Sequence, residues 1–175
     1  MKLVVNNEIH LSEIQPSDKK ACVEHLQEKE IYDRTLRIPH PYTEQDFDQF
    51  MELVKKKAAE QGEAFAWAIR KDDGHMIGGL GFDNLIPGKS HRAEIGYWLA
   101  KPYWGRGITT AVVGAACAHV FSQYGLVKIS AHVFAGNTRS ARVLEKCGFE
   151  LEGYLRKHHL KDGRYLDAQL YALLK

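Results

Sequence analysis

The stretch HRAEIGYWLAKPYWGRGITTAVVGAACAHV, residues 91–120, decides how this chain folds. Its first ten residues are rich in apolar and aromatic side chains and predict a β-strand over residues 91–100. Gly105 and Gly107 follow in a short turn, and a run of small apolar residues then predicts a helix over residues 107–124. The first N–H groups of such a helix are unpaired and point at the turn, which makes the turn a candidate cradle for a phosphate or pyrophosphate group.

The spacing of this turn differs from that of two better-known phosphate-binding motifs. The chain contains neither the P-loop pattern GxxxxGK[ST] nor the dinucleotide pattern GxGxxG. The two glycines could also do no more than connect the strand to the helix, because glycine reaches backbone conformations that other residues avoid. Taken alone, this stretch leaves both interpretations open.

The rest of the sequence predicts a mixed α/β sheet with helices packed against it. We expect further strands over residues 8–14, 64–71, 75–82, 127–134, 149–156 and 165–174, and further helices over residues 17–29, from Thr43 onward and over 137–147. Phe47, Phe50 and Met51 lie on one face of the helix that Thr43 caps, so we expect them in the core. The length of 175 residues fits a single domain, 1–175.

Composition excludes several classes of protein. The net charge of +2 argues against a dedicated nucleic-acid-binding protein. Three scattered cysteines without a CxxC pair argue against a zinc ribbon or a thioredoxin-type site and favour a reducing cytoplasm. The N-terminus lacks the apolar run of a signal peptide, and the longest apolar stretch, residues 111–118, is too short to cross a membrane. We therefore expect a cytoplasmic protein that contacts neither membrane nor nucleic acid.

Three ordered motifs give the sequence a wider resemblance. They are residues 94–99 (EIGYWL), residues 103–110 (YWGRGITT) and residues 137–149 (NTRSARVLEKCGF). Together they resemble the GNAT superfamily of acetyl-CoA-dependent N-acetyltransferases over nearly the whole chain. Residues 38–43 (IPHPYT) and the strand with Glu152-Gly153 are similar to the RimJ/RimL branch, which contains the ribosomal-protein N-terminal acetyltransferases.

The resemblance implies the GNAT fold. That fold is α/β, with a mixed, mostly antiparallel sheet of about seven strands and helices on both faces. The sheet is expected to split between the 93–100 strand and the 127–134 strand. In the family, the pantetheine arm of the cofactor lies in that split and pairs with the strand backbone like a partial extra strand.

The resemblance also implies acetyl-CoA as cosubstrate and no metal. The residues that it assigns to the cofactor are Trp98, Leu99, Trp104, Gly105, Arg106, Gly107, Ile108, Thr109, Thr110, Asn137 and Ser140. Thr109 departs from the glycine or alanine that the family usually has there, and its β-branched side chain adds bulk near the phosphates. Asn137 could equally serve only as a helix N-cap.

Catalysis needs an acid for the leaving thiolate and a base for the amine. The resemblance puts Ser140 near the thioester sulfur, while Leu144 stands where many members have a tyrosine. Glu94 and His159 are the two candidate bases, the second because imidazole titrates near neutral pH. An exposed serine, solvent-facing histidines and proton transfer through water remain the plain alternatives.

We expect an N-acetyltransferase that acts on a primary amine. The acceptor would be a protein N-terminus such as that of a ribosomal protein, a polyamine or an amine-bearing antibiotic. Two alternatives remain, an acyltransferase acting on an amino acid and a CoA-binding regulatory module with little turnover. The acceptor loops are expected at residues 30–43 and 156–165, and the sequence leaves a homodimer open.

Overall fold

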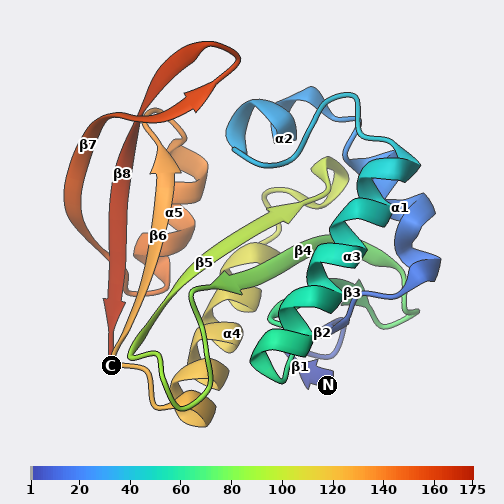
Figure 1. Cartoon of the computed structure of the whole chain (residues 1–175), viewed down its shortest axis with the longest axis horizontal. Helices are drawn as coiled ribbons and strands as arrows, with labels where there is room; N and C mark the ends of the chain where they lie inside the picture. Colours follow the sequence, from blue (N-terminus) through green and yellow to red (C-terminus); the bar gives the residue numbers. More distant parts are fainter. Residues whose placement is uncertain (1) are drawn as a thin grey trace.

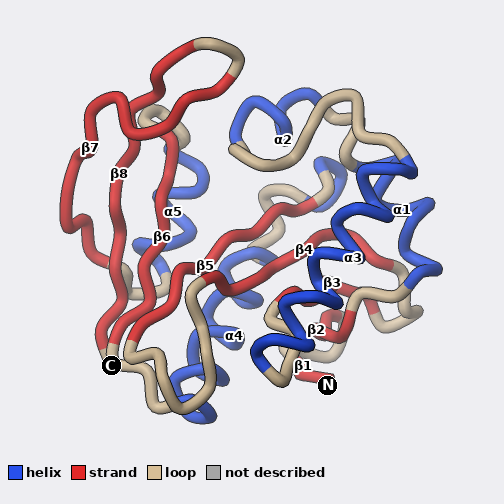
Figure 2. Tube along the Cα trace, in the orientation of Figure 1, coloured by secondary structure: helices blue, strands red, loops and turns tan. Residues whose placement is uncertain are grey.

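Eight strands form one sheet in the computed structural model, which describes residues 2–175 (Figures 1 and 2). They are β1 (Lys2–Val4), β2 (Ile9–Glu13), β3 (Ala66–Lys71), β4 (Met76–Asp83), β5 (Arg92–Leu99), β6 (Lys128–Phe134), β7 (Glu150–Lys161) and β8 (Arg164–Leu174). Their order across the sheet is β1-β2-β3-β4-β5-β6-β8-β7. Neighbours are antiparallel except β5 and β6, which are parallel. The predicted mixed, mostly antiparallel sheet is confirmed, with the short β1 as an additional strand.

Helices cover both faces of this sheet, as predicted (Figure 1). They are α1 (Lys19–His25), α2 (Lys29–Arg34), α3 (Glu44–Gln61), α4 (Ile108–Tyr124) and α5 (Thr138–Lys146). Alternation along β3 divides the core between the two faces. Trp67 and Ile69 pack in the cluster that contains α4 and α5, whereas Ala68 packs in the cluster that contains α1 to α3.

The predicted helix over residues 17–29 is wrong in its continuity. Ser17 lies in a short 3₁₀ turn (Pro16–Asp18), α1 ends at His25, and α2 begins a new helix at Lys29. The break has a local cause, because the extended Glu28 uses its side chain to accept a hydrogen bond from the N–H of Glu30. This break allows α2 to lie apart from α1, beside the tip of the β7–β8 hairpin (Figure 1).

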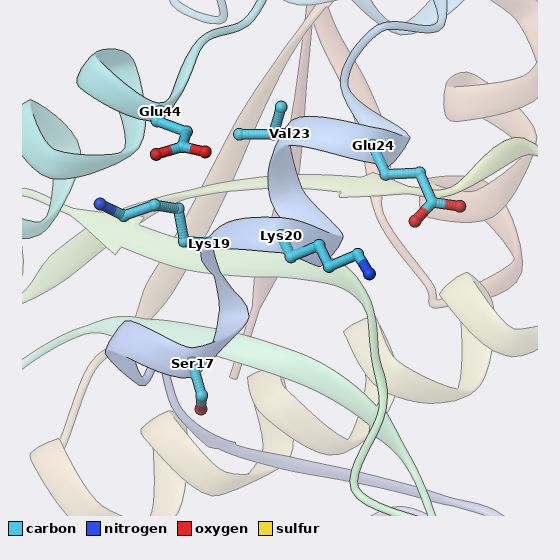
Figure 3. A pocket seen from close by; sticks show the side chains of 6 residues that line it. All are labelled: Ser17, Lys19, Lys20, Val23, Glu24 and Glu44. Atoms are coloured by element: carbon cyan, nitrogen blue, oxygen red, sulfur yellow. The ribbon is translucent and has the colours of Figure 1, made fainter.

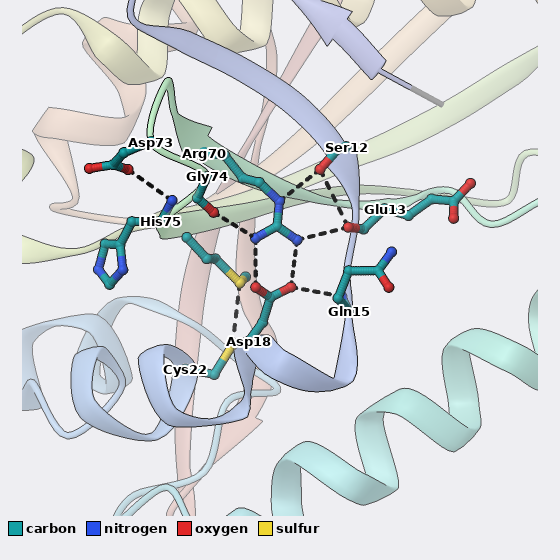
Figure 4. Close-up of polar contacts among 10 residues, drawn as sticks. Ser12, Glu13, Gln15, Asp18, Cys22, Arg70, Asp73, Gly74 and His75 are labelled. Atoms are coloured by element: carbon teal, nitrogen blue, oxygen red, sulfur yellow. Dashed lines mark hydrogen bonds and ion pairs between the residues drawn. The ribbon is translucent and has the colours of Figure 1, made fainter.

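A buried ion pair fixes the first helical turn to the sheet (Figure 4). Arg70 on β3 donates from Nη1 and Nη2 to the two carboxylate oxygens of Asp18, each at 2.6 Å. Its Nε donates to Ser12 Oγ at 2.7 Å, and Nη1 and Nη2 also donate to the carbonyls of Gly74 and Glu13. Both charged side chains are under 10% exposed, so each charge is stabilised by its partner rather than by water.

The sheet splits where the sequence predicts. Strands β5 and β6 pair over three residues only, from Arg92 opposite Lys128 to Glu94 opposite Ser130. Beyond Glu94 the two strands diverge, and Figure 1 shows the opening between them. The rest of β5 therefore has a strand neighbour, β4, on one side only.

Candidate active site

A cleft of about 1500 Å³ occupies the split and its surroundings. The structure brings all of the predicted site residues to it, although the sequence separates them by up to 65 positions. These residues are Glu94, Trp98, Leu99, Trp104, Gly105, Arg106, Gly107, Ile108, Thr109, Thr110, Asn137, Ser140 and His159. The opening in the sheet thus has the candidate binding loop at one end and the candidate acid and bases along its walls.

The loop before α4 has the form of an anion cradle. Gly105 and Gly107 have φ of 75° and 76°, the left-handed region that glycine adopts most easily. A Cβ added to Gly107 would meet no heavy atom of residues 2–175 within 4 Å, so the space above the loop is open. The first helical hydrogen bond runs from the N–H of Ala111 to the carbonyl of Gly107. The N–H groups of Ile108, Thr109 and Thr110 precede it and are available to an anion such as pyrophosphate.

Along β5, every second residue turns its backbone N–H and C=O groups toward the split. Ala100 donates its N–H to the carbonyl of Ile77 at 2.8 Å, so the even-numbered residues of β5 turn their backbone groups toward β4. Tyr97 and Leu99 therefore turn theirs toward the split. Pairing of a ligand with the backbone was expected at Trp98 and Leu99; the backbone groups of Trp98 point toward β4 instead, so Leu99 and Tyr97 are the residues whose backbone faces the split.

Trp104 holds the C-terminal end of β5, on the side that faces the split. Its indole Nε1 donates to the carbonyl of Leu99 at 2.6 Å. The guanidinium groups of Arg34 and Arg139 lie 5.9 and 5.2 Å from the Trp104 ring. Such cation–π contacts join α2 and α5 to the loop and add positive charge beside it.

A hydroxyl pair lies on the α4–α5 face of the split. The phenol oxygen of Tyr97 is 2.8 Å from Ser140 Oγ, and Asn137 Oδ1 accepts from the N–H of Ser140 at 3.4 Å. Asn137 is therefore the N-cap of α5, as its alternative role predicted. Burial raises the pKa of Tyr97, so its hydroxyl keeps its proton at any working pH. Tyr97 was not predicted as the partner of Ser140 from the sequence.

A carboxylate and three imidazoles lie on the opposite face. His132 Nδ1 on β6 is 2.9 Å from Glu94 Oε1 on β5. The His158 ring stacks on His132, with centroids 4.9 Å apart and planes at 15°, and the His159 centroid lies 4.6 Å from that of His158. Burial, then the neighbouring His158 and His132, lower the pKa of His159. The sequence did not point to His132; the pairing of Glu94 with Ser130 puts it, two residues further along β6, on the face of Glu94.

An irregularity in β7 brings its histidines into this cluster. The pairing of β7 with β8 shifts register between Leu155 and His159. Lys157 has φ of 52°, and its N–H donates to Asp167 Oδ1 at 2.7 Å. The hydroxyl of Tyr154 donates to the other oxygen of Asp167 at 3.0 Å. These two hydrogen bonds stabilise the bulge. The bond from Lys157 and then the bond from Tyr154 also lower the pKa of the Asp167 carboxyl.

At the rim of the cleft, side chains connect α2 with the turn between β7 and β8. Tyr32 on α2 donates its hydroxyl to the carboxylate of Asp162, at 2.6 and 2.7 Å from the two oxygens. Lys161 Nζ lies 3.6 Å from the centre of the Tyr32 ring and donates to the carbonyls of Tyr32 and Thr35. These contacts fasten the tip of the β7–β8 hairpin to α2, and they join the two predicted acceptor loops.

A second depression, of about 480 Å³, lies away from the split on α1 and the start of α3 (Figure 3). Its lining is mainly charged, and Lys19 there already pairs with Asp48 at 2.8 Å. We assign it no chemistry. Within residues 2–175 no group of three or more His, Cys, Asp or Glu side chains is arranged to hold a metal ion. No helix in that range combines the length and apolar character of a membrane span.

Comparison with known proteins agrees with this geometry. A model of the acetyltransferase (GNAT) domain matches residues 8–150. The chain is 31% identical over 115 residues to the ribosomal protein uS5 alanine N-acetyltransferase of Escherichia coli, covering 65% of this chain and 59% of that one. It is 28% identical over 170 residues to the L-amino acid N-acetyltransferase AaaT of Escherichia coli, covering 97% and 99%. The structure of Mycobacterium smegmatis RimJ in complex with CoA-disulfide superimposes with a TM-score of 0.84 at 25% identity, over 95% of this chain and 81% of that one.

Proposed function

Because the chain belongs to the GNAT family of acetyltransferases, whose domain model matches residues 8–150, we propose that its acceptor is the N-terminal amine of a protein. The chain is an N-acetyltransferase, and transfer of an acetyl group to an amine fits its relatives. The observation that carries the proposal is the split itself. It opens through the sheet and has a hydroxyl pair, Tyr97 with Ser140, on one face and a carboxylate–imidazole pair, Glu94 with His132, on the other.

We propose acetyl-CoA as the cosubstrate, which supplies the activated acetyl thioester. The backbone N–H groups of residues 105–109 would hold its pyrophosphate, and the open space at Gly107 supports this role. The split-facing backbone of Tyr97 and the N–H of Leu99 would hold the pantetheine arm, with Asn137 beside it and with Trp104 occupying the carbonyl of Leu99. The RimJ relative was solved in complex with CoA-disulfide, which agrees with a CoA-binding cleft in this fold.

The two faces divide the proton chemistry. On the α4–α5 face, the Ser140 hydroxyl would donate a proton to the departing sulfur. On the other face, the cluster that contains Glu94 and His159 would take the proton of the amine. An attack through the plane of the sheet follows from this arrangement.

The acceptor side of the cleft has features that suit a peptide. Leu36, Phe50 and Leu53 are between 36% and 48% exposed and line the cleft beside α3, where apolar side chains of a peptide could rest. Of the cations that line this part of the cleft, Arg37 and Lys57 both bind Asp83, at 2.5 and 2.7 Å, and Arg34 lies over the ring of Trp104. A free amino acid would need a cation for its carboxylate, whereas a peptide at the same position has a neutral amide.

The proposal is tested by measuring thiol release from acetyl-CoA with a panel of amines. The panel holds short peptides with free N-terminal alanine or serine, the same peptides with blocked N-termini and an internal lysine, polyamines, and free amino acids. We expect turnover with the free N-termini and at most weak turnover with the blocked peptides. Preference for free amino acids would contradict the acceptor proposal. Binding of CoA without turnover of any amine would indicate a regulatory module instead.

We also propose a cytoplasmic setting. The free thiols of Cys22, Cys117 and Cys147 are stable there, and newly made protein N-termini are present. Fractionation of cells that express the tagged chain at its native level tests this, and recovery outside the cytoplasm would contradict it.

A further inference from the structure

We propose that His132 is the group that takes the proton from the acceptor amine, and that Glu94 is the residue that positions it. This inference rests on the proposed acetyl transfer and identifies the base within that site. His132 was not among the residues that the sequence pointed to, and it differs from both bases expected there, Glu94 and His159.

His132 lies on β6 at the point where the split between β5 and β6 begins. The last paired residue of β6 toward β5 is Ser130, so His132 is the next residue on the same face as β5 turns away. Its neighbours Ala131 and Val133 are buried on the α4–α5 face of the sheet. His132 therefore points to the other face, the one that α1 to α3 cover and where we place the acceptor. The side chain is 21% exposed and lines the cleft, so it is reachable by a ligand yet largely shielded from solvent.

The contact with Glu94 sets the chemical state of the ring. An ionised carboxylate only accepts hydrogen bonds, so the short Nδ1–Oε1 contact of 2.9 Å requires the proton on Nδ1. The neutral imidazole then has its lone pair on Nε2, the atom that a base needs. Glu94 also stays in contact with the imidazolium that forms once Nε2 has taken a proton, as a carboxylate does beside the histidine of a catalytic triad.

The surroundings of His132 hold the ring and contribute little further charge. From β7, His158 stacks on it and His159 meets it edge-on, with centroids 6.0 Å apart. From β8, the residue opposite is the uncharged Leu170. Burial lowers the pKa of His159, which keeps that ring neutral near pH 7. Across the cleft, the hydrogen bond to Asp83 and, to a smaller extent, the charges of Asp83 and Glu94 raise the pKa of Arg37.

The two earlier candidates fit the task less well in this geometry. Glu94 has one oxygen committed to His132, and a carboxyl is a weak base near neutral pH unless its pKa is raised. His159 also lines the cleft, but its ring packs against other rings, those of Phe134 on β6 and His158 on β7, whereas the ring of His132 contacts a carboxylate that fixes its tautomer. His132 is the imidazole on the strand that forms the wall of the split.

The step balances as follows. His132 Nε2 takes one proton from the ammonium form of the acceptor and releases it to solvent. The lone pair of the neutral amine forms the C–N bond, the C–S bond breaks, and its electron pair leaves on sulfur. The nitrogen loses a second proton and the sulfur gains one, so each turnover yields an amide, a thiol and one proton in solution.

The first test reads the state of the ring without any cosubstrate. In ¹⁵N NMR spectra of the free protein above pH 7, His132 should show a protonated Nδ1 and an unprotonated Nε2. In Glu94→Ala the ring should lose this fixed tautomer and approach the mixture of an exposed histidine. A protonated Nε2 in the wild-type protein would overturn the proposal, because that atom would then have no lone pair to offer.

The second test measures kcat/KM against pH with a peptide acceptor. His132→Gln should lower kcat/KM by about 10²–10⁴-fold at pH 7 and recover toward the wild-type rate at high pH, where the amine is already neutral. The exposed His91 supplies a matched control, and His91→Gln should match the wild type. Calorimetry with CoA checks that each variant keeps its fold and its cofactor site, and added imidazole should partly rescue His132→Ala.

Two results separate failure of this inference from failure of the proposed function. If wild-type and His132→Gln proteins are equally active at pH 7, or if only His159→Gln loses the titration, His132 is not the base although the enzyme is an acetyltransferase. If the wild-type protein binds CoA and acetylates no amine, the proposed function fails and the base proposal fails with it.

Discussion

The phenol oxygen of Tyr97 lies 2.8 Å from the hydroxyl oxygen of Ser140, and this contact ties β5 to the first turn of α5. Three residues earlier on β5, Glu94 contacts His132 on the opposite face. One strand therefore supplies a polar partner to each side of the split. Because successive side chains of a strand alternate between faces, an odd separation of three residues is what allows this division.

Replacing Ser140 with alanine should lower kcat by about 10²-fold while changing the KM for acetyl-CoA little, because a hydroxyl that assists thiolate departure acts in the transition state. Tyr97→Phe should lower kcat by less, since Ser140 keeps its own hydroxyl. Steady-state kinetics measure both, with Ser122→Ala on the exposed side of α4 as control. A wild-type kcat in Ser140→Ala would exclude this role.

Replacing Gly107 with valine should weaken CoA binding at least about tenfold, or about 1.4 kcal/mol, because the side chain enters the space above the loop. Gly88→Val is a matched control, since Gly88 also has a positive φ, 71°, and open space around it but lies outside the cleft. Calorimetry should find the affinity unchanged in Gly88→Val. Equal affinities in both variants would argue against pyrophosphate binding at this loop.

Replacing Asp18 with alanine should cost about 3–5 kcal/mol of unfolding free energy, because it leaves the guanidinium of Arg70 buried without its counter-charge. Asp48→Ala breaks the exposed pair with Lys19 and should cost at most about 1 kcal/mol. Urea titration measures both free energies. Similar losses in the two variants would mean that burial adds nothing to this ion pair.

Lowering the pH from 7.5 toward 5.5 should destabilise the protein through its histidines. Burial lowers the pKa of His25 in the folded state, so the unfolded chain binds more protons in this range. Its stabilisation is therefore complete above the unfolded pKa of about 6.5 and is lost as the pH falls below it. His25→Gln should flatten the dependence of unfolding free energy on pH, whereas parallel curves for the two proteins would contradict this.

Local patterns in the sequence predicted the strand, the loop and the helix of residues 91–124 because each depends on its own residues. The three-residue β1 lacked a pattern long enough to recognise and forms by pairing with β2. Phe50 shares a helical face with Phe47, yet Phe47 is 1% exposed and Phe50 36%, because the cleft rather than the core lies beside Phe50.

In the candidate site, too, the parts that are continuous in sequence were predicted and the contacts between distant residues were not. The binding loop is continuous in sequence, and every residue assigned to it lines the cleft. His132 and Tyr97 were missed because their partners, Glu94 and Ser140, lie 38 and 43 positions away and meet them only after the sheet and α5 have formed. Alternation along β5 and β6 gives the face of each side chain, but the register between the two strands requires the structure.

The split also changes how the molecule behaves when no ligand is bound. An open sheet ordinarily has two edges, whereas the divergence of β5 from β6 gives this one an additional pair of unpaired borders in its interior. Unpaired strand borders can recruit strands from other chains, so we expect the ligand-free protein to aggregate more readily than the ligand-bound one. A ligand that completes hydrogen bonds along β5 would protect one border and raise thermal stability by mass action. With CoA as the proposed ligand, purification and storage in its presence should therefore extend the working life of the protein.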